Sequence, residues 1–136
     1  MIVVDNSLLV PSIIRNEWSE RARRFTSSDA EWIVPPLWQY EFTNVMVTFA
    51  RAGRLTSKDV YDAVDEARLL VSHRVVAVDQ HDAVRIAMAF GLSAYDAQYA
   101  ALAHAYGVRC VTNDRQFASR AAALVDHLDD LPSPRG

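Results

Sequence analysis

Short apolar runs that alternate with longer segments of helical periodicity are the feature that most constrains how this chain can fold. The runs that we interpret as strands are residues 2–4, 31–34, 75–78 and 108–112, with residues 125–128 as a further edge strand. Short apolar runs of this kind are typical of parallel strands that are buried on both faces. The sequence therefore predicts an α/β fold, with a mostly parallel central sheet of four to five strands flanked by helices.

The segments between these runs carry helix signals. We expect helices at residues 17–26, 37–52, 56–72, 79–90 and 115–123, and one after Asp5 that Asn6 or Ser7 caps. A further helix ends at Gly107, since glycine commonly stands just past a helical end. The residues that recur at helical spacing on that helix, and so predict one apolar stripe, are Tyr95, Tyr99, Leu102 and Tyr106.

Length and composition set modest limits on the class of protein. A chain of 136 residues is long enough for one domain with a real core, and we assign residues 1–130 to it and residues 131–136 to a flexible tail. Cys110 is the only cysteine, which fits a reducing, cytoplasmic location. No segment reads as a signal peptide or reaches transmembrane length, so no membrane contact is expected. The net charge of −3 argues against indiscriminate nucleic-acid binding but allows a local basic patch.

Four acidic residues fall where this topology would bring them together. Asp5 and Asp114 each follow a predicted strand, while Glu41 and Asp96 lie in the opening turns of predicted helices. In open α/β sheets, ligands bind beyond the carboxyl ends of the strands. A helix that returns to a parallel strand begins at that same edge. We therefore expect the four carboxylates to converge.

Three of these acids also have a simple structural explanation. Asp96 stands three residues after Ser93, which is the spacing of a capping box, and two other segments of the chain show the same pattern. Spacing alone therefore favours a helix cap for Asp96. Asp114 could cap the helix that follows it, and Glu41 could be a solvated helix residue.

Asp5 is the hardest of the four to explain in structural terms. A carboxylate directly after Ile2–Val4 in a central strand would be at least partly buried, which is costly without a partner. Basic partners are scarce, because Lys58 is the only lysine and the arginines cluster elsewhere. A bound metal cation is the simplest partner for these carboxylates. Hard oxygen ligands with no nearby cysteine–histidine set point to Mg²⁺ or Mn²⁺.

The segments that contain these acids, in order along the chain, are Ile2–Ser7, Val34–Glu41, Tyr95–Ala103 and Val111–Phe117. Together they resemble the motifs of the PIN-domain family, and most closely those of the small VapC-type ribonuclease toxins of bacterial toxin–antitoxin systems. The resemblance extends over nearly the whole chain, and the four motifs together are specific. Asn6 is a departure, because the family more often has a small residue or threonine there.

The resemblance implies a three-layer PIN-like fold and a metal-dependent endoribonuclease activity. The residues expected to hold Mg²⁺ or Mn²⁺ are Asp5, Glu41, Asp96 and Asp114, of which Asp5 and Asp96 would be direct ligands. The residues expected to orient these carboxylates by hydrogen bonds are Ser7, Thr112 and Asn113. Hydrolysis of a phosphodiester needs an activated water and neutralised charge, and metals held by clustered acids supply both.

The resemblance also implies partners: an RNA substrate, a cognate antitoxin protein and a second copy of the chain in a homodimer. Arginines that could draw RNA to an acidic site are Arg15, Arg21, Arg23, Arg24 and Arg115, although a solvated helix face explains them equally well. The bulky residues of the 37–52 helix fit an interface or a core.

Two rival functions make different demands on the sequence. A phospho-receiver domain also gathers acids at strand ends, but it needs a lysine after a late strand, and Lys58 lies mid-chain on a predicted helix. A catalytically inactive PIN-like protein that serves only in binding is harder to separate from a nuclease. The presence of all four acids favours the nuclease.

Overall fold

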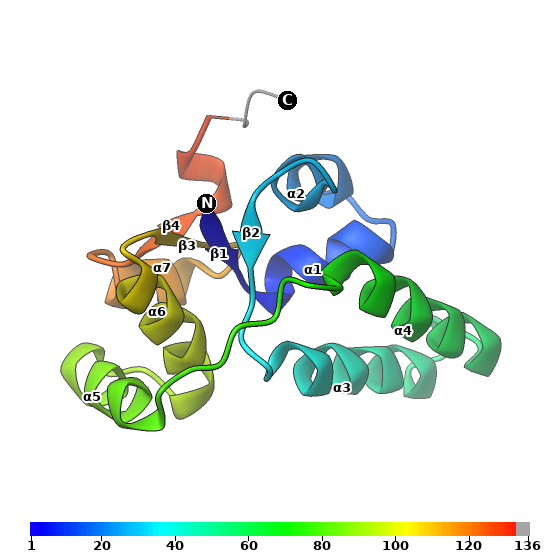
Figure 1. Ribbon diagram of the computed structural model, residues 1–136. Coiled ribbons are helices and arrows are strands. Elements are labelled where there is room, and N and C mark those ends of the chain that lie inside the picture. Colours follow the sequence, from blue (N-terminus) through cyan, green and yellow to red (C-terminus); the bar gives the residue numbers. More distant parts are fainter. Residues whose placement is uncertain (133–136) are drawn as a thin grey trace.

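The computed structural model describes residues 1–132 and shows a four-stranded sheet in which every pair of neighbouring strands is parallel (Figure 1). The strands are β1 (Ile2–Val4), β2 (Trp32–Ile33), β3 (Arg109–Thr112) and β4 (Val125–His127), in the order β2-β1-β3-β4. β1 and β3 are the two inner strands, and Val4 pairs with Val111 where both strands approach their carboxyl ends. The predicted α/β fold with a parallel sheet is confirmed.

Within residues 1–132, seven α-helices connect these strands and one short 3-10 helix follows the last of them. Their bounds are α1 (Asn6–Ile13), α2 (Ser19–Thr26), α3 (Trp38–Arg51), α4 (Ser57–Val71), α5 (Gln80–Phe90), α6 (Ala94–Tyr106), α7 (Arg115–Arg120) and η1 (Leu128–Asp130). No helix in this part of the chain is long and apolar enough to cross a membrane.

The sheet separates two hydrophobic cores. Successive strand residues point to opposite faces, so Val4 and Val111 lie in one core and Val3 and Cys110 lie in the other. The first core packs helices α1 to α4 against the sheet, and the second packs α5, α6 and α7. Figure 1 shows α3 and α4 on one side of the sheet and α5 and α6 on the other. The carboxyl ends of the inner strands thus open between two helical layers.

Helix α6 packs against the inner strands β1 and β3. Its most buried alanines, each 2% exposed or less, are Ala97, Ala100, Ala101 and Ala103. Small side chains let the helix backbone approach its neighbours, and Tyr99 and Leu102 fill the remaining space. The predicted stripe of tyrosines is wrong at both ends, because Tyr95 and Tyr106 are 65% and 50% exposed. The alanines, and not the outer tyrosines, form the buried face.

The strand predicted at residues 75–78 is wrong. Only Val75 forms a bridge, with Val34, and Val76 donates its N–H to the carbonyl of Val34. The chain then leaves the sheet and runs as an extended linker from α4 to α5 (Figure 1). Val76 and Val78 pack on the second core while Val75 is 46% exposed. An apolar linker that covers a core has the same composition as a short strand, so the sequence pattern could not separate them.

Smaller differences concern the ends of elements. Asp5, and not Asn6 or Ser7, caps α1, because its side chain accepts the N–H of Ser7. The last helix ends at Arg120 instead of continuing to residue 123, and α2 begins at Ser19 instead of residue 17. The predicted tail, 131–136, lies outside the described residues from residue 133 onward.

Candidate metal centre

Asp5 stands where β1 ends and α1 begins, and its side chain is held from two directions. Oδ1 accepts the backbone N–H of Ser7 at 3.0 Å and the hydroxyl of the same residue at 2.5 Å. Oδ2 accepts the hydroxyl of Thr112, from β3, at 2.5 Å. Asp5 is 8% exposed. Both oxygens of a buried carboxylate are therefore fixed in position by neutral donors.

The two hydroxyls that hold Asp5 are themselves anchored by the turn after β3. The Ser7 hydroxyl oxygen accepts the backbone N–H of Asn113 at 2.7 Å, and the Thr112 hydroxyl oxygen accepts that of Asp114 at 3.0 Å. This network joins the carboxyl ends of two neighbouring parallel strands. Ser7 and Thr112 thus contact Asp5 through their side chains, whereas Asn113 contributes its backbone.

Burial dominates the electrostatics of Asp5. It raises the pKa of this carboxyl group from 3.8 to about 7, against the hydrogen bonds from Ser7 and Thr112, which lower it. The negative charge of Asp96 raises the pKa further. No cation among the described residues forms an ion pair with Asp5. A carboxylate in this state is a strong acceptor for an added positive charge.

Glu41 lies in the first turn of α3 and is half-buried. The phenol of Tyr99, on α6, donates a hydrogen bond to its Oε1 at 2.6 Å. Burial raises the pKa of Glu41, the bond from Tyr99 lowers it, and the charge of Asp96 raises it again. Sequence reasoning counted Tyr99 only as an apolar residue. The available signal was chemical, since a tyrosine inside an alanine-rich buried helix needs a partner for its hydroxyl.

Asp96 occupies the first turn of α6. Its backbone N–H takes part in the helix cap, whereas its carboxylate does not. The Ser93 hydroxyl accepts the N–H of Asp96 at 3.0 Å. Within residues 1–132, the return bond that completes a capping box is formed at the Thr56–Asp59 pair of α4 but not here. Burial raises the pKa of Asp96, followed by the charge of Asp114, while Arg120 lowers it. The carboxylate is thus available for another partner.

Asp114 does serve as a helix cap. Its Oδ1 accepts the backbone N–H groups of Gln116 at 2.9 Å and Phe117 at 3.2 Å at the start of α7. Asp114 is exposed, and its charge raises the pKa of Asp96. The structural explanation for Asp114 is therefore correct, and it leaves the second oxygen of the side chain for other contacts.

Electrostatic interactions connect Asp96 with each of the other three predicted acids. Asp96 raises the pKa of Asp5 and of Glu41, and Asp114 raises that of Asp96. Like charges that perturb one another in this way lie close together. The structure therefore brings all four residues to the carboxyl edge of the sheet.

The donor set at this edge fits a hard divalent cation. Within residues 1–132, no three histidine, cysteine, aspartate or glutamate side chains already stand close enough to enclose an ion. Mg²⁺ rarely needs such a cage, because it keeps several waters and is often bound by one or two carboxylates. The Oδ1 atom of Asn6, next to Asp5, is buried and has no hydrogen-bond partner in the described part of the chain. An acceptor of this kind suits a metal-bound water.

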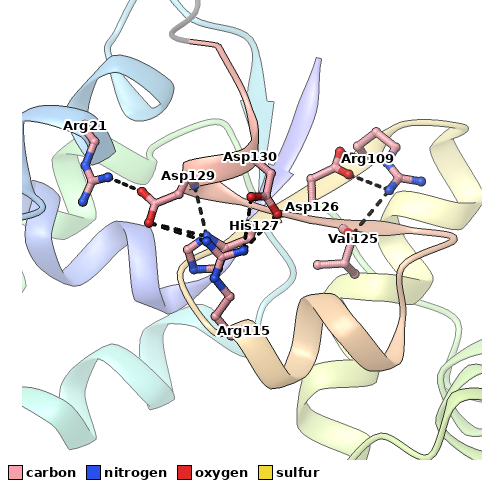
Figure 2. Close-up of polar contacts among 8 residues, drawn as sticks. All are labelled: Arg21, Arg109, Arg115, Val125, Asp126, His127, Asp129 and Asp130. Carbon is pink, nitrogen blue, oxygen red and sulfur yellow. Dashed lines mark hydrogen bonds and ion pairs between the residues drawn. The ribbon is translucent and has the colours of Figure 1, made fainter.

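Several of the arginines considered as candidates for RNA contact form ion pairs with acids outside the candidate site. Figure 2 shows Asp129 between Arg21 and Arg115, and Arg115 also pairs with Asp130 at 3.0 Å. These contacts tie η1 to α2 and α7. Arg24 pairs with Glu20 along α2. Arg120, which the sequence did not single out, lowers the pKa of Asp96 through its charge.

The family follows from comparison with known proteins. A family model of the PIN domain matches residues 2–123. The chain belongs to the PIN domain family. Among characterised PIN proteins, Ribonuclease VapC3 of Pyrobaculum aerophilum is 34% identical over 128 residues, which cover 91% of this chain and 97% of that protein. The resemblance drawn from the four acidic motifs is confirmed.

Solved structures show the same PIN fold. A crystal structure of a protein from Pyrobaculum aerophilum aligns with a TM-score of 0.74 and 22% identity, over 95% of this chain and 84% of that one. A toxin–antitoxin complex from Klebsiella pneumoniae aligns with a TM-score of 0.69 and 14% identity, over 94% of this chain and 98% of that one. The predicted PIN-like architecture is thus confirmed.

Proposed function

We propose that this PIN domain is a metal-dependent endoribonuclease and the toxin of a type II toxin–antitoxin pair. The observation that carries the proposal is Asp5, a buried carboxylate at a strand end that couples to Asp96 and has no cationic partner among the described residues. Similarity to a protein named as a ribonuclease, and to a protein solved as a toxin–antitoxin complex, supports it.

In this proposal the acids divide the work of holding Mg²⁺ or Mn²⁺. Asp5 and Asp96 bind the ion directly, while Glu41 and Asp114 bind the same ion, a second ion or its waters. When bound, the ion would supply an activated water and neutralise charge at the scissile phosphate.

The chain's own residues prepare this site. Ser7 and Thr112 hold both oxygens of Asp5, so the carboxylate needs no reorganisation when a cation arrives. Asn113 and Asp114 fix those hydroxyls through their backbone N–H groups. The charge of Arg120 limits the mutual repulsion of the acids and offers a contact for a phosphate.

The proposal includes partners and a location. RNA is the substrate, an antitoxin protein covers the acidic edge of the sheet, and two copies of the chain form a homodimer in the cytoplasm. Large exposed apolar side chains on α3 to α6 suit such contacts, among them Tyr40, Leu69, Met88 and Tyr95.

The deciding experiment is a cleavage assay on single-stranded and looped RNA. We expect the purified protein to cut RNA with added Mg²⁺ or Mn²⁺, to stop in EDTA and to resume when metal is restored. Sequencing the ends of the products would give the preferred target. Absence of metal-dependent cleavage across a broad transcript pool would favour the alternative, a catalytically inactive PIN-like binding protein.

A further inference from the structure

Tyr99 makes a polar contact that its position in the fold does not require. It is 2% exposed and packs in the second core, yet its hydroxyl reaches across to Oε1 of Glu41 at 2.6 Å. Glu41 belongs to α3, whose buried residues Phe42 and Met46 pack in the first core. The bond therefore joins the two helical layers at the acidic edge of the sheet.

The Tyr99 hydroxyl can donate a hydrogen bond to Glu41 and still keep its own proton. A phenol is protonated at neutral pH, so Tyr99 remains a donor. A short bond to one carboxylate oxygen restricts rotation of the side chain and leaves the other oxygen for a ligand.

We propose that Tyr99 is a positioning residue, whose phenolic O–H holds the Glu41 side chain oriented toward the cation that the acidic site binds. The inference rests on the proposed function and adds a residue that none of the four acidic motifs required for chemistry. The rival explanation is that Glu41 merely satisfies a buried hydroxyl. In that case phenylalanine at position 99 would leave metal binding intact.

The test compares Tyr99→Phe with Tyr106→Phe, a matched loss of one hydroxyl at an exposed site on the same helix. The affinity of the metal-free protein for Mn²⁺ is measured by calorimetry, and kcat and KM for RNA are measured separately. We expect Tyr99→Phe to weaken Mn²⁺ binding on the order of 10- to 100-fold, as loss of a residue that orients a metal ligand does. The loss of rate should fall on kcat, with KM little changed. Tyr106→Phe should behave as wild type.

A double-mutant cycle with Glu41→Gln shows whether Tyr99 acts through Glu41. If it does, the double variant binds Mn²⁺ no more weakly than Glu41→Gln alone. Additive losses, or wild-type Mn²⁺ affinity in Tyr99→Phe, would overturn the inference. Glu41→Asp gives a second measurement if Tyr99→Phe does not fold, because the shorter side chain keeps its charge but moves away from the phenol. Glu41→Asp should then also weaken Mn²⁺ binding, and unchanged affinity would count against the inference.

The two proposals fail in different ways. A wild-type protein that neither binds Mn²⁺ nor cuts RNA would overturn the proposed function itself. A wild-type protein that does both, with Tyr99→Phe unchanged, would overturn only the role of Tyr99.

Discussion

The three aspartates of the candidate site have different surroundings and therefore different roles. Asp5 is buried and held by Ser7 and Thr112, whereas Asp114 is exposed and spends one oxygen on a helix cap. Asp96 lies between these cases, half-buried and with a carboxylate that its own helix cap does not use. Substitutions that remove charge but keep shape can separate these roles.

Asp96→Asn is expected to abolish cleavage and to leave the metal-free protein at least as stable as wild type, because it removes repulsion among the acids. Mn²⁺ should raise the melting temperature of the wild type and barely move that of the variant. Thermal melts in EDTA and in Mn²⁺ measure both effects. A pure cap role predicts instead a loss on the order of 0.5–1 kcal/mol with or without metal. Equal metal-induced shifts would exclude Asp96 as a ligand.

Asp5 predicts a pH dependence for the metal-free protein. Its pKa is about 7 when folded and 3.8 as the ordinary value, so between these limits the folded state binds more protons than the unfolded chain. Stability must then fall as pH rises through this window, and the full penalty is present above it. Since one pKa unit corresponds to about 1.4 kcal/mol, wild type should lose on the order of 4 kcal/mol of stability relative to Asp5→Asn as the pH rises from about 4 to about 7.

Urea unfolding of both proteins in EDTA, from about pH 3 to pH 8, measures that difference. Asp5→Asn keeps the shape of the side chain and removes its charge, so each pH provides a matched pair. Parallel stability curves for the two proteins would contradict the prediction.

At the level of elements, helix termini deliver most of the polar groups to the site. The side chain of Asp5 caps α1, that of Ser93 caps α6 and that of Asp114 caps α7, all at the carboxyl edge of the sheet. Capping and metal binding draw on the same residue types, because both use side-chain oxygens, as hydrogen-bond acceptors in one case and as ligands in the other. Spacing in the sequence therefore cannot separate the two roles.

Asp114 allows them to be separated by substitution. Asparagine caps helices about as well as aspartate, so Asp114→Asn should keep the stability of the protein while weakening Mn²⁺ affinity and cleavage. Asp114→Ala should lose the same activity and about 1 kcal/mol of unfolding free energy as well. Denaturant unfolding and Mn²⁺ calorimetry on the pair give the answer. If Asp114→Asn binds Mn²⁺ as tightly as wild type does, Asp114 serves only as a helix cap.

The candidate site lies at the carboxyl edge of the sheet, between the helical layers that form the two cores. Asp5 and Asp114 come from the strand ends, Glu41 from the first helical layer and Asp96 from the second. The Tyr99–Glu41 bond joins the layers beside the site, and the Arg21–Asp129–Arg115 contacts tie the C-terminal η1 to α2 and α7 (Figure 2). The geometry of the site therefore depends on how the two layers dock on the sheet.

The assembly of the protein is a further prediction at this scale. We expect a homodimer in solution, because apolar side chains such as Leu69 and Met88 are 80% and 82% exposed. Light scattering measures the molar mass directly. Co-expression with the products of neighbouring genes tests for an antitoxin, which should copurify and suppress cleavage. A strictly monomeric protein that no such product inhibits would contradict both parts.

The sequence by itself determined the α/β class and the parallel sheet, because these depend on local patterns. The assignment of the four acids as metal ligands stays a prediction. Ile2–Val4 and Arg109–Thr112 are short and apolar enough to be recognised as strands, and Gly107 ends α6 with φ of 63° as its position suggested. The acids could be found because parallel topology sends strand ends and helix starts to one edge.

Only the tertiary structure decided which groups contact one another. Residues 75–78 match a strand in composition, but just one bridge forms before Val76 and Val78 turn to cover the second core. Tyr99 and Glu41 are 58 positions apart in the sequence, and Thr112 and Asp5 are 107 apart, so no local pattern predicts either hydrogen bond. Burial of Asp5 is likewise a property of the assembled layers. The physical reason is that hydrophobic periodicity specifies which face of an element is buried, whereas the partners of polar groups depend on how those faces dock.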